Sequence, residues 1–367
     1  MRVLLAAGGT GGHVIPALTV ARVLTRRLPA CSCLAVSSGR GVVAQVWDPA
    51  VGALATVPVA PWPQGRQVLD PRYWWRQAGA AGRLQQLVRR YRPQVVVGFG
   101  GAVSGPTVIV AKLRGVPAVI HEQNVLPGRA TRWLAAWADR IAVSFEETRQ
   151  HLPARAPVLV TGNPVRPEVE GALAGAAALA ALRLASGTPV LLIMGGSQGA
   201  HAVNAVSVEA MARLPVPRRR MIQLLHLTGA RDLAWVTARY RALGVAARVQ
   251  AFLPTMGLAY AAATAAVARA GATTVAELVA TATPAVLIPY PHAGAHQAVN
   301  AAWLGRRGGA LVLEQAALTP DRFLEAVWPL LTDGARLAAM RAALRRVATP
   351  GAAERVADAV LEVARAA

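Results

Sequence analysis

The chain has 367 residues, 54% of them hydrophobic, and 39 basic against 18 acidic residues give it a formal net charge of +21. This length and apolar content predict a large buried core and favour two domains over one. The only two cysteines, Cys31 and Cys33, are too close in sequence for a disulfide between them to cross-link distant parts of the chain, which excludes a disulfide-stabilised scaffold. We interpret them as buried thiols in a strand of a protein from a reducing compartment.

Arginine supplies almost all of the positive charge, because Lys112 is the only lysine. Two explanations stay open: base composition or a hot habitat, and an anionic partner such as nucleic acid, a phosphorylated substrate or an acidic membrane face. Glycines interrupt the first apolar run, so no signal peptide is visible. The uncharged stretches 93–111 and 278–305 contain Gly or Pro and are expected to be strand, loop and following segment rather than membrane spans.

Short apolar runs alternate with Ala- and Leu-rich helical patterns along the chain. The strands predicted in the first half are residues 2–8, 95–101, 117–123, 140–145 and 157–162. Those predicted in the second half are residues 189–196, 221–229, 248–253, 265–271 and 284–290. Continuous apolar strands alternating with helices are typical of parallel sheets covered on both faces. The fold class predicted is therefore α/β, with doubly wound parallel sheets.

One motif occurs twice. The paired glycines of "RVLLAAGGTGGH" lie at 8–9 and those of "PVLLIMGGSQGAH" at 195–196, and each pair follows an apolar strand and precedes a helix. Two Rossmann-like domains, each beginning with its own glycine turn, explain both copies. Proline and glycine concentrate at 161–175, where we place the boundary, and one Arg/Ala-rich helix is expected from about Asp333 onward.

The first glycine turn, "GGTGGH" at 8–13, opens a predicted helix. A helix N-terminus attracts phosphate through its unpaired N–H groups, and glycine lets an anion approach the backbone. The turn does not match the dinucleotide pattern G-x-G-x-x-G, so a nicotinamide cofactor is not indicated. A purely structural strand-to-helix turn remains the alternative.

His13 closes this turn at the carboxyl end of the first predicted strand, where open α/β sheets bind ligands. An imidazole there has an unperturbed pKa of about 6.5 and suits a general base. A structural histidine, or one that only orients substrate, is the alternative. Thr10 offers a hydroxyl for a diphosphate or sugar oxygen.

Six motifs occur in order: "GGTGGH" (8–13), "HEQN" (121–124), "GNPVR" (162–166), "GGSQGA" (195–200), "GATTVAE" (271–277) and "HQAVN" (296–300). Together they resemble the MurG family of peptidoglycan N-acetylglucosaminyltransferases (glycosyltransferase family 28), over essentially the whole chain. The resemblance implies a GT-B fold, in which two Rossmann-like domains face a cleft. It implies residues 1–163 as the acceptor and membrane domain, 164–340 as the UDP-GlcNAc domain, and 341–367 as a C-terminal helix that returns toward the first domain.

The family's reaction transfers N-acetylglucosamine from UDP-GlcNAc to the C4 hydroxyl of MurNAc in lipid I, with inversion, giving lipid II for peptidoglycan synthesis. The resemblance implies no metal or other cofactor, and the sequence has no Asp-x-Asp motif or His/Cys/Asp cluster at metal-ligand spacing. The departing diphosphate is then expected to rely on helix N-termini, hydroxyls and arginine. The expected location is the cytoplasmic face of the cell membrane, as a peripheral protein.

Carried over position by position, the resemblance makes His13 the catalytic base. It assigns UDP-GlcNAc binding to Thr10, Gly11, Gly12, Asn124, Arg166, Ser197, Gln198, Leu253, Ala272, Thr273, Thr274, Val275, Ala276, Glu277 and Gln297. It places Gly100, Gly101, Ser104, His121 and Glu122 on the acceptor side. Among these, Glu277 is expected to accept hydrogen bonds from the ribose hydroxyls, although a helix-surface acid is the alternative, and His121 and Glu122 are expected to support rather than perform the chemistry.

Residues 60–94 combine aromatic and basic side chains, among them Trp62, Tyr73, Trp74, Trp75 and Arg76. Aromatic rings favour the membrane interface and arginines meet anionic headgroups. We expect this segment to dock on an anionic membrane surface, the alternative being tryptophans packed inward. Two other functions stay open: another GT-B enzyme that uses a UDP-sugar, such as a glycolipid glycosyltransferase or a UDP-GlcNAc 2-epimerase, and a basic nucleic-acid-binding protein. No nucleic-acid-binding motif is visible, so no nucleic-acid partner is expected.

Overall fold

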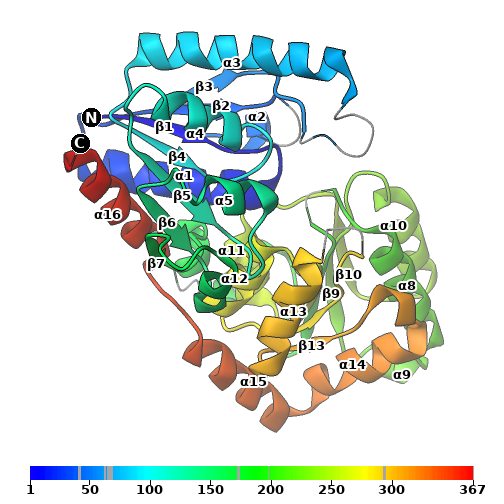
Figure 1. The fold of residues 1–367 in the computed structure, drawn as a ribbon. Coiled ribbons are helices and arrows are strands. Elements are labelled where there is room, and N and C mark those ends of the chain that lie inside the picture. The colour runs from blue at the N-terminus through cyan, green and yellow to red at the C-terminus, as the bar shows by residue number, and fades with distance from the viewer. Residues whose placement is uncertain are drawn as a thin grey trace. The chain divides into compact units, whose positions relative to one another are not determined.

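The computed structural model describes residues 1–39, 43–61, 63, 69–171, 174–196, 198–291 and 295–366. The predicted site residues Trp62 and Ser197 lie outside these ranges. The chain divides into two compact units, which we call unit 1 (Met1–Val165 with Gly351–Ala367) and unit 2 (Arg166–Pro350). Each has a parallel sheet with helices on its faces, as the sequence predicts for the fold class (Figure 1).

The sheet of unit 1 has seven parallel strands in the order β3-β2-β1-β4-β5-β6-β7. Its strands are β1 (Arg2–Ala6), β2 (Ser32–Ser37), β3 (Gly52–Thr56), β4 (Val95–Gly98), β5 (Ala118–Glu122), β6 (Arg140–Val143) and β7 (Val158–Val160). Its helices are α1 (Gly11–Arg27), α2 (Val43–Val46), α3 (Pro71–Tyr91), α4 (Ser104–Lys112), α5 (Arg129–Leu134), the 3₁₀ helix η2 (Glu146–His151) and α16 (Ala352–Arg365). The central strands are buried on both faces, which explains their uninterrupted apolar sequences.

The sheet of unit 2 has six strands in the order β10-β9-β8-β11-β12-β13. Its strands are β8 (Val190–Met194), β9 (Gln223–Leu227), β10 (Ala247–Gln250), β11 (Ala265–Ala268), β12 (Ala285–Leu287) and β13 (Ala310–Val312). Its helices are α6 (Pro167–Glu170), α7 (Gly175–Ala181), α8 (His201–Arg213), α9 (Val216–Arg219), α10 (Leu233–Ala242), α11 (Met256–Ala262), α12 (Ala272–Ala280), α13 (His296–Arg306), η3 (Gln315–Ala317), α14 (Pro320–Thr332) and α15 (Gly334–Arg346). In each unit the strand before the glycine turn, β1 or β8, is third in its sheet, as an internal repeat requires.

Two helices occupy the C-terminal stretch for which the sequence predicts one. α15 ends at Arg346, and Pro350 and Gly351 separate it from α16. Proline has no N–H to continue a helix, and Gly351 takes a left-handed φ of 72° that most side chains avoid. The break lets the chain leave unit 2 and place α16 in unit 1.

α16 packs against α1 in unit 1 (Figure 1). Its apolar face contributes Val356, Val360 and Val363 to the core of that unit. On its polar face, Glu354 pairs with Arg26 at 3.1 Å and Asp358 with Arg27 at 2.5 Å. Exposed pairs of this kind add little stability, so the buried valines hold the helix in place.

Cys31 and Cys33 are buried free thiols, as predicted. No described helix is long and apolar enough to cross a membrane.

Candidate functional site

The predicted site residues of unit 1, which include catalytic, UDP-GlcNAc-binding and acceptor-side residues, gather at the carboxyl edge of its sheet. β1, β4 and β5 are neighbours there, and the strand order reverses on either side of β1. Loops that leave neighbouring parallel strands at such a reversal form the usual ligand-binding crevice of α/β sheets. The loop after β1 carries Thr10 and His13, the loop after β4 carries Gly100 and Gly101, and the loop after β5 carries Asn124.

The His13 ring lies against the backbone of the loop after β4. A Cβ built at Gly100 would lie 2.9 Å from His13 Cδ2 and 3.0 Å from its Nε2. Gly101 touches Gly8 so closely that a Cβ there would collide with the Gly8 Cα, and both Gly100 and Gly101 have positive φ. At Gly100 and Gly101, glycine is therefore required both by the positive φ and by the lack of space for a Cβ.

Thr10 fixes the other side of the ring, because its Oγ1 lies 3.0 Å from His13 Nδ1. Thr10 is the exposed N-cap of α1, and Gly11 and Gly12 form the first helical positions after it. When Nδ1 carries the proton and donates it to Thr10 Oγ1, Nε2 keeps its lone pair. Nε2 has no hydrogen bond within the described residues, so it is the nitrogen that can accept a proton.

Burial lowers the pKa of His13 below its ordinary value of 6.5, and the nearby charge of Glu122 opposes this shift only in part. A lowered pKa keeps the imidazole neutral near pH 7. A neutral histidine with one free nitrogen is the state that a general base needs.

The "HEQN" segment builds a buried polar support beneath His13. Gln123 Nε2 donates to Phe99 O at 2.9 Å and lies 3.1 Å from His121 Nδ1, while His121 Nε2 donates to Gly162 O at 3.3 Å. Burial lowers the pKa of His121 to about 4, so its ring is neutral and its Nδ1 accepts. His121 therefore joins three loops and is 1% exposed, which fits the supporting role expected for it.

Glu122 organises the loop that carries Asn124. Its Oε1 accepts from the backbone N and the Nδ2 of Asn124 at 3.0 and 3.1 Å. Its Oε2 accepts from Gly128 N at 3.0 Å and from Thr131 Oγ1 at 2.5 Å. One buried carboxylate thus sets the conformation of residues 124–131, and its contact with ligand would pass through Asn124.

Ser104, predicted on the acceptor side, is 1% exposed. Its Oγ lies under β4, 2.5 Å from where a Cβ on Gly98 would stand. The hydroxyl thus lies behind the glycine loop, whose backbone is left as the surface that can meet a ligand.

The predicted nucleotide residues of unit 2 form a second group. Glu277, on α12, pairs with Arg166 at 2.5 Å and accepts from the Tyr260 hydroxyl at 2.9 Å through its other oxygen. Glu277 is 4% exposed, which excludes a helix-surface acid. Burial raises its pKa, while Arg166 and Tyr260 work against that rise. Each carboxylate oxygen has a second lone pair, so the pairs to Arg166 and Tyr260 leave acceptor capacity for a ligand hydroxyl.

Most of the side chains of α12 that were predicted to bind the nucleotide are buried or half-buried. Ala272, Thr273 and Val275 are buried, and Thr274 and Ala276 are half-buried. Gly271 is the N-cap of α12, and having no side chain it leaves room for a ligand to approach the first turn of the helix. The backbone N–H groups of this first turn are the feature of α12 suited to phosphate.

Leu253 is buried beside Phe252, which is 51% exposed.

Gln198 is exposed in the second glycine turn. Gln297, in the first turn of α13, accepts from Tyr290 N at 2.9 Å through its Oε1. This bond fixes one end of its carboxamide and ties the end of the β12 loop to α13.

The comparisons with known proteins show the family of the chain. The glycosyltransferase family 28 N-terminal domain matches residues 3–143 and the family 28 C-terminal domain matches residues 190–359. A protein of Symbiobacterium thermophilum named UDP-N-acetylglucosamine–N-acetylmuramyl-(pentapeptide) pyrophosphoryl-undecaprenol N-acetylglucosamine transferase is 41% identical over 372 residues, covering 100% of this chain and 97% of that protein. The chain belongs to the MurG group of glycosyltransferase family 28.

A further relative and two solved structures are similar to nearly the whole chain. A transferase of the same name from Syntrophotalea carbinolica is 37% identical, covering 97% of each chain. The crystal structure of Acinetobacter baumannii MurG has a TM-score of 0.77 and 27% identity, covering 98% of this chain and 99% of that one. The Staphylococcus aureus MnaA-UDP structure, at 12% identity, a TM-score of 0.69 and coverage of 97% and 94%, shares the fold alone.

Three residues in these two groups were missed by the sequence analysis: Gln123 in unit 1, and Tyr260 and Phe252 in unit 2. Tyr260 lies in an apolar helix, α11, where an aromatic residue is typical of core packing, so only the structure reveals its bond to Glu277. Gln123 stands inside the "HEQN" motif and its position there was the available signal. Phe252 directly precedes Leu253, and its exposed ring is suited to stacking on a base.

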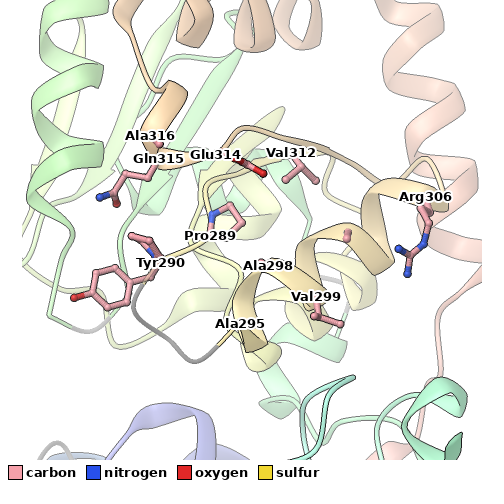
Figure 2. A pocket seen from close by; sticks show the side chains of 12 residues that line it. Pro289, Tyr290, Ala295, Ala298, Val299, Arg306, Val312, Glu314, Gln315 and Ala316 are labelled. Atoms are coloured by element: carbon pink, nitrogen blue, oxygen red, sulfur yellow. The ribbon is translucent and has the colours of Figure 1, made fainter. Parts of the chain in front are cut away.

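A pocket of about 460 Å³ adjoins Gln297 (Figure 2). It lies between α13 and the segment from β13 to η3, and Tyr290, Ala298, Arg306 and Glu314 line it. Arg269, buried below Tyr290, stacks on its ring at 5.4 Å and donates to Gln315 Oε1 at 2.6 Å. The pocket wall is thus held by charge and stacking contacts. Among the described residues, no three His, Cys, Asp or Glu side chains gather where they could hold a metal ion.

Proposed function

We propose that this protein transfers N-acetylglucosamine from UDP-GlcNAc to the C4 hydroxyl of the MurNAc residue of lipid I, forming lipid II and UDP with inversion at the anomeric carbon. The observation that carries this proposal is the end-to-end similarity, at 41% identity, to a transferase named for these substrates. The geometry of His13 supports it. Thr10 holds the ring through Nδ1, the lowered pKa keeps the ring neutral, and Nε2 has no hydrogen bond to the described residues.

In the proposed reaction, the C4 oxygen of the acceptor attacks the anomeric carbon of GlcNAc. The bond from that carbon to the diphosphate oxygen breaks and leaves its electron pair on UDP. His13 Nε2 takes the proton of the C4 hydroxyl as the new bond forms. Thr10 and the backbone at Gly100 keep the ring in place during the transfer, because Thr10 bonds to its Nδ1 and Gly100 packs against its other edge.

The leaving diphosphate gains negative charge as the bond breaks, and preorganised donors stabilise such charge most effectively. The backbone N–H groups at the start of α12 and in the second glycine turn are suited to this task. Arg166, which pairs with Glu277 on α12, supplies a positive charge to the same unit. Glu277 accepts from the ribose hydroxyls, and Asn124 and Gln297 bind hydroxyls of the sugar.

The test is UDP release from UDP-GlcNAc, measured with and without a soluble lipid I analogue, in EDTA. We expect release that requires the analogue and is unchanged by EDTA. Equal release without the analogue would indicate hydrolysis or epimerisation instead. Absence of release under every condition, with UDP bound, would contradict the proposed transfer.

Docking on an anionic membrane surface from its cytoplasmic side is part of the proposal, and α3 is the element that supports it. Trp74 and Trp75 near its start are 53% and 79% exposed, rather than packed inward. Arg76 is exposed beside them, and α3 has no acidic residue. Tyr73 differs from its neighbours, because its hydroxyl donates to Pro61 O at 3.1 Å and anchors the start of α3. Two tryptophans and the arginines therefore form the docking surface.

A further inference from the structure

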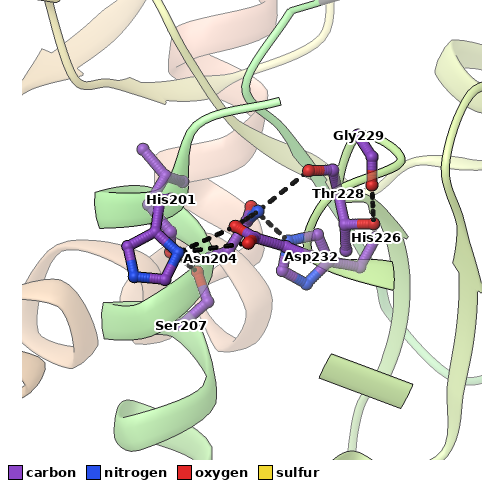
Figure 3. A network of polar contacts seen from close by, with 8 residues as sticks. His201, Asn204, Ser207, His226, Thr228, Gly229 and Asp232 are labelled. Atoms are coloured by element: carbon purple, nitrogen blue, oxygen red, sulfur yellow. Dashed lines mark hydrogen bonds and ion pairs between the residues drawn. The ribbon is translucent and has the colours of Figure 1, made fainter. Parts of the chain in front are cut away.

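A buried polar network lies behind the second glycine turn in unit 2 (Figure 3). Asn204, on α8, is fully buried and uses its whole carboxamide. Its Nδ2 donates to Thr228 O at 2.9 Å and to Asp232 Oδ2 at 2.8 Å, and its Oδ1 lies 3.0 Å from His226 Nε2. One side chain thus joins α8, the end of β9 and the loop before α10.

The protonation of this network follows from its geometry. Asn204 Oδ1 can only accept, so His226 Nε2 carries a proton and donates it. Burial lowers the pKa of His226 to about 3, so the ring is neutral and its Nδ1 accepts from the Tyr240 hydroxyl at 2.9 Å. The Nδ2 of Asn204 therefore has two acceptors and its Oδ1 has one donor, so the orientation of its amide is fixed.

Asp232 links the buried Asn204 to the exposed His201 at the outer end of the network. Burial would raise the pKa of this carboxyl, but hydrogen bonds from Trp235, Asn204 and His201 hold it below its ordinary value. The His201 ring, at the first position of α8, lies 3.0 Å from Asp232 through Nδ1 and is largely exposed. The network therefore runs from the buried Tyr240 to the start of the helix that follows the glycine turn.

The atom that Asn204 holds, the carbonyl of Thr228, is the atom against which the glycine turn packs. A Cβ at Gly199 would collide with Thr228 O, and a Cβ at Gly229 would stand 2.5 Å from Gln198 O. The backbone of 198–199 thus rests directly on the backbone of 228–229. A shift of Thr228 moves Gln198 and Gly199 with it, because nothing flexible separates them.

We propose that Asn204 is a positioning residue for the donor diphosphate, acting through the Thr228 carbonyl on the backbone of the second glycine turn. This inference rests on the proposed function, since it takes the turn to be where the diphosphate binds. Asn204 touches no ligand itself. Its effect is confined to the part of the nucleotide that the turn meets, so it distinguishes UDP from uridine.

The experiment compares dissociation constants for UDP and for uridine in the full-length protein. Asn204→Asp keeps the shape of the side chain but replaces the donor that faces Thr228 O and Asp232 by an oxygen. We expect UDP to bind at least tenfold more weakly and uridine to bind within twofold of the original protein. Ser207→Ala is the matched control: Ser207 is as buried on the same helix, but its hydroxyl donates to Val203 O one turn earlier in that helix.

An equal loss for UDP and uridine, or no loss for either, would overturn the inference. If Asn204→Asp does not fold, Gly229→Ala displaces the same backbone contact, and Gly244→Ala is its control. Gly244 has a similar positive φ of 64°, with no atom near its missing Cβ. Failure of the original protein to bind UDP would instead contradict the proposed function.

Discussion

At the scale of single residues, His13 is the side chain whose chemistry the proposed reaction needs most. Its lowered pKa gives the pH dependence a sign: the neutral ring is the active base, and activity falls only when acid protonates it. We therefore expect kcat/KM to be level near pH 7 and to decline below 6.5 on the acid side. His13→Ala should lower kcat by about two to four orders of magnitude and remove that acid limb.

The measurement is the pH profile of UDP release for both proteins, with the dissociation constant of UDP as the check on folding. A variant that turns over near the original rate would remove His13 from the role of base. A variant that loses rate but keeps the acid limb would show that another group titrates.

Gly100 gives a second prediction, about the position of His13 rather than its chemistry. Gly100→Ala places a methyl group 2.9 Å from the imidazole at a φ of 90°, so the ring must move. We expect kcat to fall by about tenfold or more, since small misplacements of reacting groups are costly. Gly115→Ala is the matched control, because Gly115 has a φ of 74° with nothing near its missing Cβ. Equal effects of the two changes on kcat would contradict the account.

At the scale of elements, α3 carries the prediction about membranes. Its inner face buries Ala80, Leu84 and Val88, whereas Trp74 and Trp75 face outward. Burying one large apolar side chain yields about 1.5–3 kcal/mol, or at least about tenfold in affinity. Trp74→Ser with Trp75→Ser should therefore weaken binding to phosphatidylglycerol vesicles by at least about a hundredfold.

Co-sedimentation with vesicles measures this binding. Met221→Ser is the control, since Met221 is 53% exposed in unit 2 and outside the docking surface. Added salt should weaken the binding of all variants, because arginine–headgroup attraction is screened. Unchanged binding of the double variant would remove α3 from the docking surface.

Much of the element pattern follows from the sequence, and the exceptions have physical reasons. Long apolar runs predicted central strands such as β4 and β8 because those strands are buried on both faces. β3 and β13 were not predicted: both are short, partly exposed strands at the edges of their sheets, so burial on both faces does not mark their sequences. Contacts between distant residues, such as Tyr260 with Glu277 or Asn204 with His226, depend on tertiary packing and leave no local pattern.

At the scale of the whole molecule, the buried histidines couple stability to pH. The folded pKa of His121 is about 4 and that of His226 about 3, against 6.5 when unfolded. Below pH 6.5 these histidines are protonated in the unfolded chain but remain neutral in the folded chain. Their contribution to the free energy of unfolding is therefore complete above pH 6.5 and is lost as the pH falls. Each histidine should lower the free energy of unfolding by about 1.4 kcal/mol per pH unit in this range.

Urea unfolding at pH 6.5 and pH 5 measures the slope. His121→Gln and His226→Gln should each reduce the pH dependence of the free energy of unfolding by about 1.4 kcal/mol per pH unit, whatever they do to stability at pH 7. His151→Gln, at an exposed position, should leave the slope unchanged. A slope that neither buried substitution alters would contradict the neutral state of these rings.

In the reaction proposed above, this chain joins a donor sugar to one particular acceptor hydroxyl. Transfer of radiolabelled GlcNAc from UDP-GlcNAc to a soluble lipid I analogue tests this, compared with the same analogue lacking the C4 hydroxyl of MurNAc. We expect labelled product and matching UDP release with the first acceptor, and neither with the second. Equal UDP release with both acceptors, or label that appears without the C4 hydroxyl, would contradict it.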